Sequence, residues 1–331
     1  MNILVITNVY LRKGLNPNQA SFVRDQLSVL HRYHPDIEFT SYIIHGQDNK
    51  LSYLRSIFEA RKLVNSGKFD LVHIHYGLSG LFLLFMKNPQ IPVIATLHGG
   101  DIQIECGHPV QVLLTKRILK KCNFVLSLNE RMRVIVSKYC NSTEIIPISV
   151  DMNYFTPSDR SSINTLKSVK IIFPASLNRP EKNHQLFEQT VNIIEHKYGY
   201  KVQEIDFDNI SHEEVLFYYK SCDLVLLTSI SEGSPGVIKE SMACNLPIVS
   251  TDVGDVAYNL QGVANCAVSP KMEAENLAKL CVKCLKHEIS GITGRERLLQ
   301  LGYDDRSIAD KIYALYSKMI AENKKNYKRK F

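Results

Sequence analysis

The sequence predicts an α/β protein with two parallel-sheet domains, and three observations support this. Short apolar runs rich in Val, Ile and Leu alternate with amphipathic helical patterns from the first residues onward. The runs are almost continuously apolar, which is typical of strands in a parallel sheet covered by helices on both faces. The alternation stops at the polar stretch TPSDRSSINTLKS, residues 156–168, and then starts again. The length of 331 residues also suits two domains of about 150 residues each.

The first half contains six candidate strands separated by helical patterns. The candidates are Ile3–Asn8, Ile37–Ile44, Leu71–Tyr76, Val93–His98, Phe124–Leu128 and Glu144–Ser149. Helical periodicity fills the gaps, as in the apolar positions between Phe22 and Leu30. We therefore expect a Rossmann-like domain over residues 1–157.

The second half repeats this order and predicts another Rossmann-like domain over residues 158–304. Its candidate strands are Lys170–Pro174, Val202–Phe207, Asp223–Thr228 and Pro247–Thr251, and its candidate helices are Glu181–His196, His212–Lys220 and Pro235–Cys244. After Met272 only helical patterns remain, and the last of them, Ser307–Ala321, carries an apolar stripe. Two parallel sheets in tandem predict a central cleft between their carboxyl ends, where open α/β folds bind ligands.

Composition and local patterns exclude several classes. With 45% hydrophobic residues the chain is not disordered. Its longest apolar stretch without charge, Leu71–Met86, falls short of the roughly 20 residues of a spanning helix. The start MNILVITNVY lacks the features of a signal peptide, so we expect a cytoplasmic protein. The eight scattered cysteines predict free thiols, and the lone CxxC pair, Cys281 and Cys284, lacks the second pair of a zinc site, so no metal is expected.

The net charge of +7 is concentrated at the end of the chain. The cations there are Lys324, Lys325, Lys328, Arg329 and Lys330. Such a basic tail suits an anionic membrane surface, near which each charge contributes about 1 kcal/mol, and a solvated, frayed terminus explains it equally well. No basic stripe interleaved with aromatic residues occurs elsewhere, so nucleic acid is not an expected partner.

The most informative segment, Asp223–Asp252, reads as strand, loop, helix and strand. Ser234 is the expected N-cap and Pro235 the first residue of a helix that ends at Cys244. The backbone N–H groups of Gly236 and Val237 then point out of the helix start, which makes an anion-binding site. Because Gly236 has no side chain, a phosphate can approach closely.

Two acids flank this predicted phosphate site. Glu240 follows Gly236 by four residues, so it lies on the same helix face, about one turn below the phosphate, where a ribose would be. Glu232 lies in the loop on the other side. Carboxylates on both sides of a diphosphate can accept hydrogen bonds from two polyols, which is the geometry of a nucleotide sugar. If they stood alone, the two acids would be ordinary surface residues.

They do not stand alone, because the segment SEGSPGVIKESMACNLPIVSTDVGD resembles the signature of family 4 glycosyltransferases. These are retaining enzymes of the GT-B fold, many of which build polysaccharides. The resemblance continues through NQASFVRDQL, FDLVHIHYGLSG, VIATLHGGDI, VDMNYFTP, FPASLNRPEKN and NISHEEVLFYYKSCDLVLLTS. It implies two Rossmann-like domains facing a central cleft. It also implies a final segment, residues 305–331, whose helix crosses back to the first domain.

The resemblance also implies roles for individual residues of the second domain. Glu232 matches the acid that holds donor-sugar hydroxyls, and Glu240 matches the acid that holds the ribose. Gly236 and Val237, with Ser234 beside them, match the backbone contacts to the diphosphate.

Three further residues match catalytic positions. Arg179 and Lys182 match the cations that neutralise the leaving diphosphate, and a solvated loop is the structural alternative. His98 in LHGGD matches the histidine that meets the donor sugar, although a single histidine at a strand end is more often structural. Asp101 is expected to support this loop or to bind acceptor. We expect His73 and His75, which alternate on a strand, to point to opposite faces of the sheet.

The combined matches imply a retaining hexosyltransferase. It would use a UDP- or GDP-sugar donor and no cofactor. The acceptor would be a glycan or lipid-linked hydroxyl, and the setting would be surface polysaccharide biosynthesis at the inner face of the cell membrane. A nucleotide-sugar epimerase of the same fold and a catalytically lapsed GT-B subunit that acts as a scaffold stay open. An NAD-dependent dehydrogenase is disfavoured because NVYLRKGLNPNQ contains no GxGxxG.

Overall fold

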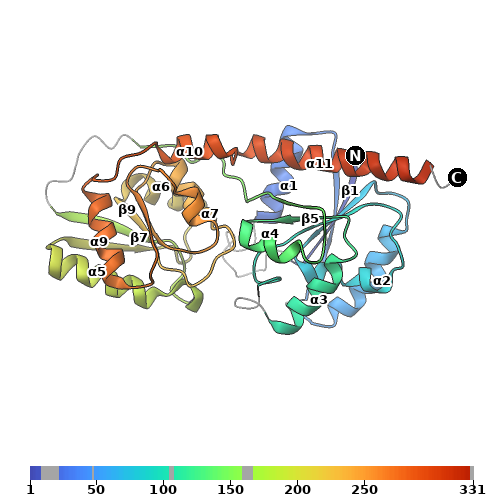
Figure 1. Ribbon diagram of the computed structural model, residues 1–331, viewed down its shortest axis with the longest axis horizontal. Coiled ribbons are helices and arrows are strands. Elements are labelled where there is room, and N and C mark those ends of the chain that lie inside the picture. The colour runs from blue at the N-terminus through green and yellow to red at the C-terminus, as the bar shows by residue number, and fades with distance from the viewer. Residues whose placement is uncertain (9–21, 47, 104–107, 159–166, 329–331) are drawn as a thin grey trace. The chain divides into compact units, whose positions relative to one another are not determined.

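Figure 1 shows the fold as a computed structural model, which describes residues 1–8, 22–46, 48–103, 108–158 and 167–328. The chain divides into two compact units. The first contains Met1–Ile148 and Arg306–Phe331, and the second contains Ser149–Asp305. Each unit is built on its own parallel sheet, so the predicted α/β class with two Rossmann-like domains is confirmed.

The first unit has a six-stranded parallel sheet in the order β2-β1-β3-β4-β5-β6. The strands are β1 (Asn2–Thr7), β2 (Glu38–Ile43), β3 (Leu71–His75), β4 (Val93–Thr96), β5 (Phe124–Ser127) and β6 (Thr143–Ile145). The helices are α1 (Phe22–Tyr33), α2 (Ser52–Val64), the 3-10 helix η2 (Gly77–Phe85), α3 (Pro109–Leu119), α4 (Glu130–Val136) and α11 (Asp305–Lys328). Because crossovers between parallel strands are right-handed, this strand order puts α2, η2, α3 and α4 on one face and α1 on the other.

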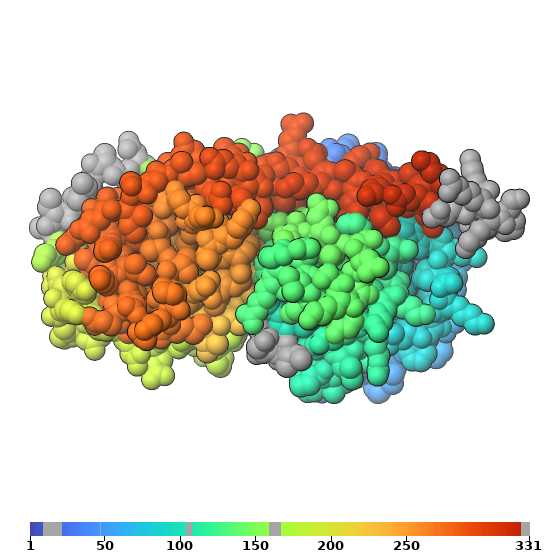
Figure 2. Space-filling view, viewed as in Figure 1, coloured from blue at the N-terminus to red at the C-terminus, as the bar shows by residue number. Residues whose placement is uncertain are grey.

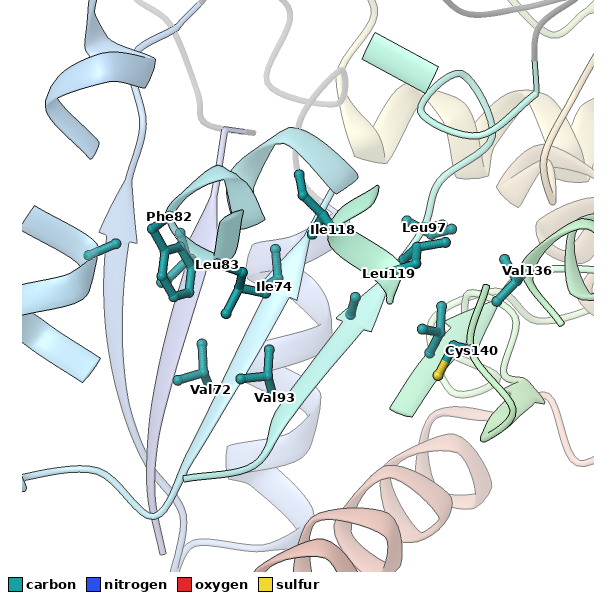
Figure 3. Close-up of a cluster of buried hydrophobic side chains, with 14 of the residues drawn as sticks. Val72, Ile74, Phe82, Leu83, Val93, Leu97, Ile118, Leu119, Val136 and Cys140 are labelled. Carbon is teal, nitrogen blue, oxygen red and sulfur yellow. The ribbon is translucent and has the colours of Figure 1, made fainter. Parts of the chain in front are cut away.

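Figure 3 shows the core on this face of the sheet, where Ile74 and Val93 of the sheet belong to one buried cluster with Phe82 of η2 and Ile118 of α3. Glycine permits this close packing. A Cβ atom on Gly77 would lie only 2.1 Å from Oγ1 of Thr115. The helix η2 therefore lies directly against α3.

The second unit has a five-stranded parallel sheet in the order β11-β10-β9-β7-β8. The strands are β7 (Ser168–Phe173), β8 (Lys201–Asp206), β9 (Leu224–Leu227), β10 (Ile248–Thr251) and β11 (Cys266–Ser269). The helices are η3 (Pro180–Lys182), α5 (His184–Tyr198), α6 (His212–Ser221), α7 (Gly236–Ala243), α8 (Val256–Asn259), α9 (Ala274–Leu285) and α10 (Gly294–Leu301). Capping boxes that begin with Ser211 and Thr293 start α6 and α10. The paired cysteines Cys281 and Cys284 are buried in the core on α9.

Three expectations about this unit and its boundary need correction. The helix predicted over Glu181–His196 is divided, because Asn183 adopts a left-handed conformation with φ of 54° between η3 and α5. The strand β11 is absent from the prediction, since CAVS is short and lacks an extended apolar run. The first domain is predicted to end at residue 157, but the first unit ends at Ile148.

Contacts within the second unit explain the earlier boundary. Val150 pairs with Asp304 in a parallel bridge, and the guanidinium of Arg295 donates hydrogen bonds to the carbonyl oxygens of Met152 and Phe155. Residues 149–155 therefore belong to the second unit. Most of the predicted linker, residues 159–166, lies outside the described residues.

The final helix α11 belongs to the first unit from Arg306 onward, so the predicted return of the chain to the first domain is confirmed. Figure 2 shows this helix along the surface of that unit. The ring of Tyr313 stacks on His34 after α1, at 3.9 Å between centroids, and His34 also bonds Asp310. The helix continues to Lys328, past the predicted end at Ala321, so the first residues of the basic tail are helical. None of the described helices has the length and apolar content of a bilayer-spanning segment.

Candidate functional site

Polar side chains gather at the carboxyl ends of strands in each unit, and each group is described within its own unit. In the second unit β7, β9 and β10 are neighbours, so the loops that follow them meet. The hydroxyl of Thr228, after β9, donates a 3.0 Å hydrogen bond to the carbonyl oxygen of Lys182, after β7. The hydroxyl of Thr251, at the end of β10, donates to the carbonyl oxygen of Ser229. These bonds hold the three loops together.

Lys182 and Glu232 form an ion pair where these loops meet. The ammonium nitrogen lies 2.5 Å from Oε1 of Glu232, and both side chains are nearly buried. The hydroxyl of Ser229 donates to the same carboxylate oxygen at 2.7 Å. The structure therefore brings two of the predicted site residues together.

Arg179 does not join this pair. Its guanidinium binds Glu181 at 2.7 Å, and both side chains are about half exposed. The predicted contact of Arg179 with a leaving diphosphate stays a prediction.

The start of α7 differs by one residue from its prediction. The helix begins at Gly236, and Pro235 occupies the N-cap position. The predicted N-cap role of Ser234 is wrong, because its hydroxyl donates a 2.6 Å bond to Asp255 and accepts one from Lys239. Tertiary contacts thus replace the local capping bond. The first N–H groups of a helix still lack intrahelical partners, so this end of α7 favours an anion.

Glu240 lies on the expected face of α7. A Cβ atom built on Gly236 would lie 3.4 Å from Oε1 of Glu240, which confirms that both residues face the same side. The hydroxyl of Tyr219 on α6 donates a 2.8 Å hydrogen bond to Oε2 of Glu240. Burial raises the pKa of Glu240, and the bond from Tyr219 opposes this rise. Sequence reasoning missed Tyr219, although its position on the inner face of a predicted helix is a usable signal.

A buried ion pair supports the loop before α7. The ammonium nitrogen of Lys239 is fully buried, 3.6 Å from Oδ2 of Asp255. Next to Asp255, Gly254 has φ of +59°, and a Cβ atom there would lie 2.6 Å from the carbonyl oxygen of Gly233. The loop after β10 therefore presses against the loop that carries Glu232. Local sequence patterns do not indicate this support.

In the first unit, Asp101 organises the loop after β4. Its buried carboxylate accepts hydrogen bonds from the backbone N–H groups of Gly77, His98 and Gly99 at 3.0–3.1 Å. The expectation that Asp101 supports this loop is confirmed. Burial raises the pKa of Asp101 to about 6, against the lowering effect of these bonds.

His98 lies in an aromatic surrounding. Its ring stacks on Tyr76 at 4.6 Å and contacts Phe22 at 4.7 Å between centroids. Nε2 of His98 shares a 3.3 Å hydrogen bond with Nδ1 of His75. Burial, aided by His75, lowers the pKa of His98 well below its ordinary value, so the imidazole is neutral at pH 7. Tyr76 follows β3 with φ of 67°, a conformation that costs energy and is common at functional sites.

The expectation for His73 and His75 is wrong. Their ring centroids are 4.2 Å apart, because residues two positions apart on a strand share one face. His73 bonds the hydroxyl of Tyr316 on α11 and the hydroxyl of Thr96. Among the described residues, no group of three or more His, Cys, Asp or Glu side chains is placed to hold a metal ion.

Both halves of the chain match glycosyltransferase family models. Residues 11–154 match Glycosyltransferase Family 4, and residues 168–287 match Glycosyl transferases group 1. Each half of the chain is therefore similar to a glycosyltransferase family. The boundary between the two matched regions lies near the boundary between the structural units. The first match covers most of the sheet of the first unit, and the second match covers the sheet of the second unit.

Two curated relatives carry glycosyltransferase names. One, from Bacillus subtilis, is described as the teichuronic acid biosynthesis glycosyltransferase TuaC; it is 22% identical, over 66% of this chain and 62% of its own. The other is D-inositol 3-phosphate glycosyltransferase from Paenarthrobacter aurescens, 24% identical over 58% of each chain. The chain thus spans about 60% of the length of these relatives.

Solved structures agree on the fold. Sucrose-phosphate synthase from Thermosynechococcus elongatus superposes with a TM-score of 0.76 and 17% identity, over 97% of this chain and 99% of the other. HepE from Anabaena, solved with UDP-glucose, gives a TM-score of 0.70 and 14% identity, over 96% and 100% of the two chains. At these identities the likeness shows the GT-B fold.

Proposed function

We propose that this chain transfers a sugar from a nucleotide-sugar donor to a hydroxyl of a glycan or lipid-linked acceptor, with retention of configuration at the anomeric carbon. The single observation that carries the proposal is the nearly buried pair of Lys182 and Glu232 beside the start of α7. It combines a cation, an acid and helix N–H groups, which are the groups that a sugar diphosphate needs.

Each group has a defined task in this proposal. Lys182 and the N–H groups of Gly236 and Val237 stabilise the charge that grows on the departing diphosphate. Glu232 orients donor-sugar hydroxyls, and Glu240 accepts hydrogen bonds from the ribose. In the first unit, the rings of Tyr76 and Phe22 hold the neutral ring of His98, and its contact with the donor sugar stays a prediction.

The proposed reaction needs no separate base. The bond between the anomeric carbon and the phosphate oxygen breaks while the acceptor oxygen bonds that carbon from the same face. The acceptor proton passes to the departing phosphate oxygen. Retention of configuration follows because attack and departure share one face.

Two relatives support the substrate classes. The name of TuaC refers to teichuronic acid biosynthesis, and HepE was solved with UDP-glucose. We therefore propose a UDP-sugar as the first donor to test, with a GDP-sugar as the alternative. A surface polysaccharide is the proposed product.

Thermal unfolding with UDP, GDP, ADP and CMP tests donor binding. A ligand at about 100 times its Kd adds roughly 2.7 kcal/mol, enough for a shift of a few degrees. We expect a shift with one nucleoside diphosphate that disappears in Lys182→Ala and Glu240→Ala but persists in Lys279→Ala, an exposed control on α9. No shift with any nucleotide would favour the lapsed subunit. Conversion of the donor sugar without an acceptor would indicate an epimerase.

A further inference from the structure

Three elements of the first unit present a second apolar face to solvent. The elements α2, η2 and α3 cover one face of the sheet, and η2 packs against both helices. Six large apolar side chains on or beside them are at least half exposed. They are Leu51, Leu54, Phe58, Phe85, Val110 and Leu113.

Helical spacing turns these residues outward together. On α2, the buried positions Ile57, Ala60 and Val64 face the core, and the exposed residues Leu54 and Phe58, one turn apart, lie along its border. On α3, Val110 and Leu113 lie opposite Val112 and Ile118. Single exposed apolar residues are normal, but a group of six on adjacent elements marks an interaction surface.

Positive charge predominates on this surface, with exposed Asp48 as an acid beside it before α2. Exposed cations on and beside the three elements are Lys50, Arg55, Lys62, Lys87, Arg117, Lys120 and Lys121. Glu59 is the only acidic residue in the sequences of α2, η2 and α3, and it is paired with Arg55 at 2.6 Å. Apolar side chains bordered by Lys and Arg are typical of helices that lie in a membrane interface.

The basic tail reaches the border of the same surface. The side chain of Asn323 on α11 donates a hydrogen bond to the carbonyl oxygen of Gln90, and Nζ of Lys324 lies 3.9 Å from Asp70. Gln90 and Asp70 precede β4 and β3, so this end of α11 lies at the amino edge of the sheet. Because crossover helices run antiparallel to their strands, the ends of α2 and α3 lie at this edge as well, with Lys62 and Lys120.

We propose that this surface, formed by α2, η2 and α3, docks on an anionic lipid bilayer. The six apolar side chains enter the boundary between headgroups and acyl chains, and the cations contact the lipid phosphates and carboxylates. The inference goes beyond the proposed function, because it predicts binding to lipid without nucleotide, donor or acceptor.

Sedimentation of the full chain with vesicles tests this surface. Vesicles of phosphatidylcholine with phosphatidylserine should bind the chain, and binding should weaken with salt. The double variant Leu54→Ser with Phe58→Ser should lower the partition coefficient at least about tenfold. The matched control, Phe217→Ser on α6 with Leu299→Ser on α10, removes exposed apolar side chains from the second unit and should bind like the parent.

A charge-reversal pair tests the electrostatic part. Arg117→Glu with Lys120→Glu should lower binding to the anionic vesicles at least about thirtyfold. The control, Lys279→Glu with Lys283→Glu, reverses two exposed lysines one turn apart on α9 and should have a much smaller effect.

Four results would overturn the proposal. The first three are absence of vesicle binding by the parent, unchanged vesicle binding by the serine double variant, and an equal loss of vesicle binding in the surface and control variants. The fourth is a parent that is dimeric at the assay concentration and becomes monomeric in the serine variant, which would assign the surface to a second copy instead. The nucleotide-induced thermal shift is recorded for every variant, so loss of lipid docking and loss of donor binding are distinguished.

Discussion

The ammonium nitrogen of Lys182 lies 2.5 Å from Oε1 of Glu232, although the two residues are 50 positions apart in the chain. Each follows a different strand, β7 or β9, and these strands are adjacent in the sheet. Each side chain neutralises the other and holds it in place. In the proposed function a bound diphosphate would attract the same ammonium group, so the pair would align a cation in advance of donor binding.

Replacement of Lys182 by Met should therefore have two effects. Loss of one preorganised cation should lower the rate of transfer by about 10²- to 10³-fold. It also leaves the nearly buried carboxylate of Glu232 without its partner, which should cost about 2–4 kcal/mol of unfolding free energy. Urea unfolding without ligand measures the second effect, and turnover with a matched donor measures the first.

The double variant Lys182→Met with Glu232→Gln separates these effects. Because the uncompensated charge is removed, stability should recover by at least about 1 kcal/mol relative to Lys182→Met. Activity should stay low. Equal instability of the single and double variants would show that the two side chains are not coupled.

The sequence reveals some residues of this site and conceals others for a physical reason. Glu232 and Glu240 lie in one short segment whose helix, loop and spacing are local features, so the sequence alone is enough to place both. Tyr219 and Asp255 act on that segment from α6 and from the loop after β10. Contacts of this kind depend on strand order, which the pattern of apolar runs does not determine.

Tyr219 should set the pH dependence of nucleotide binding. Burial raises the pKa of Glu240, and the hydrogen bond from Tyr219 lowers it. Tyr219→Phe removes the lowering effect, so the pKa rises further. The proposed ribose contact uses the ionised carboxylate. The acidic limb of the affinity profile should therefore move to higher pH, and affinity at neutral pH should fall about fivefold.

Calorimetric titration of the nucleoside diphosphate from pH 5 to pH 8 measures this shift. Tyr218→Phe, at the neighbouring position on α6, is the control and should leave the profile in place. A profile of Tyr219→Phe identical to that of the parent would contradict the role of this hydroxyl.

The raised pKa of Asp101 predicts that its contribution to the unfolding free energy changes with pH in the opposite direction to that of a typical surface acid. Burial raises its pKa from 3.8 to about 6, so between these values the folded chain holds a proton that the unfolded chain has released. The contribution of this group to the unfolding free energy therefore falls as pH rises through that window, by roughly 3 kcal/mol in total. Asp101→Asn cannot ionise and should lack this component.

Urea unfolding of Asp101→Asn and the parent at several pH values from 4 to 7 measures the difference directly. The stability of the parent relative to the variant should be greatest at the acidic end. A difference that is constant with pH would show that the three backbone hydrogen bonds keep the carboxylate ionised throughout.

Local rules failed at positions where buried polar groups compete for the same atoms. Ser234 has the residue type and position of an N-cap, yet its hydroxyl is bound by Asp255 and Lys239. Lys239 itself lies among helical residues that resemble any amphipathic surface, and only its zero exposure reveals its role. Charged groups buried by tertiary packing are thus the part of this site that sequence patterns do not show.

Lys239→Met provides the test of that buried pair. The substitution leaves the nearly buried carboxylate of Asp255 without its cation, so the unfolding free energy should fall by about 3 kcal/mol. It also releases Ser234 and the loop that carries Glu232, so nucleotide affinity should fall although Lys239 is not a proposed donor contact. Adding Asp255→Asn removes the unpaired charge and should restore most of the stability. Lys283→Met, an exposed substitution on α9, should change neither quantity. If Lys239→Met alone were as stable as the parent, desolvation of the two charges would already offset their attraction, and the loop before α7 would owe its position to Gly254 and its packing against Gly233.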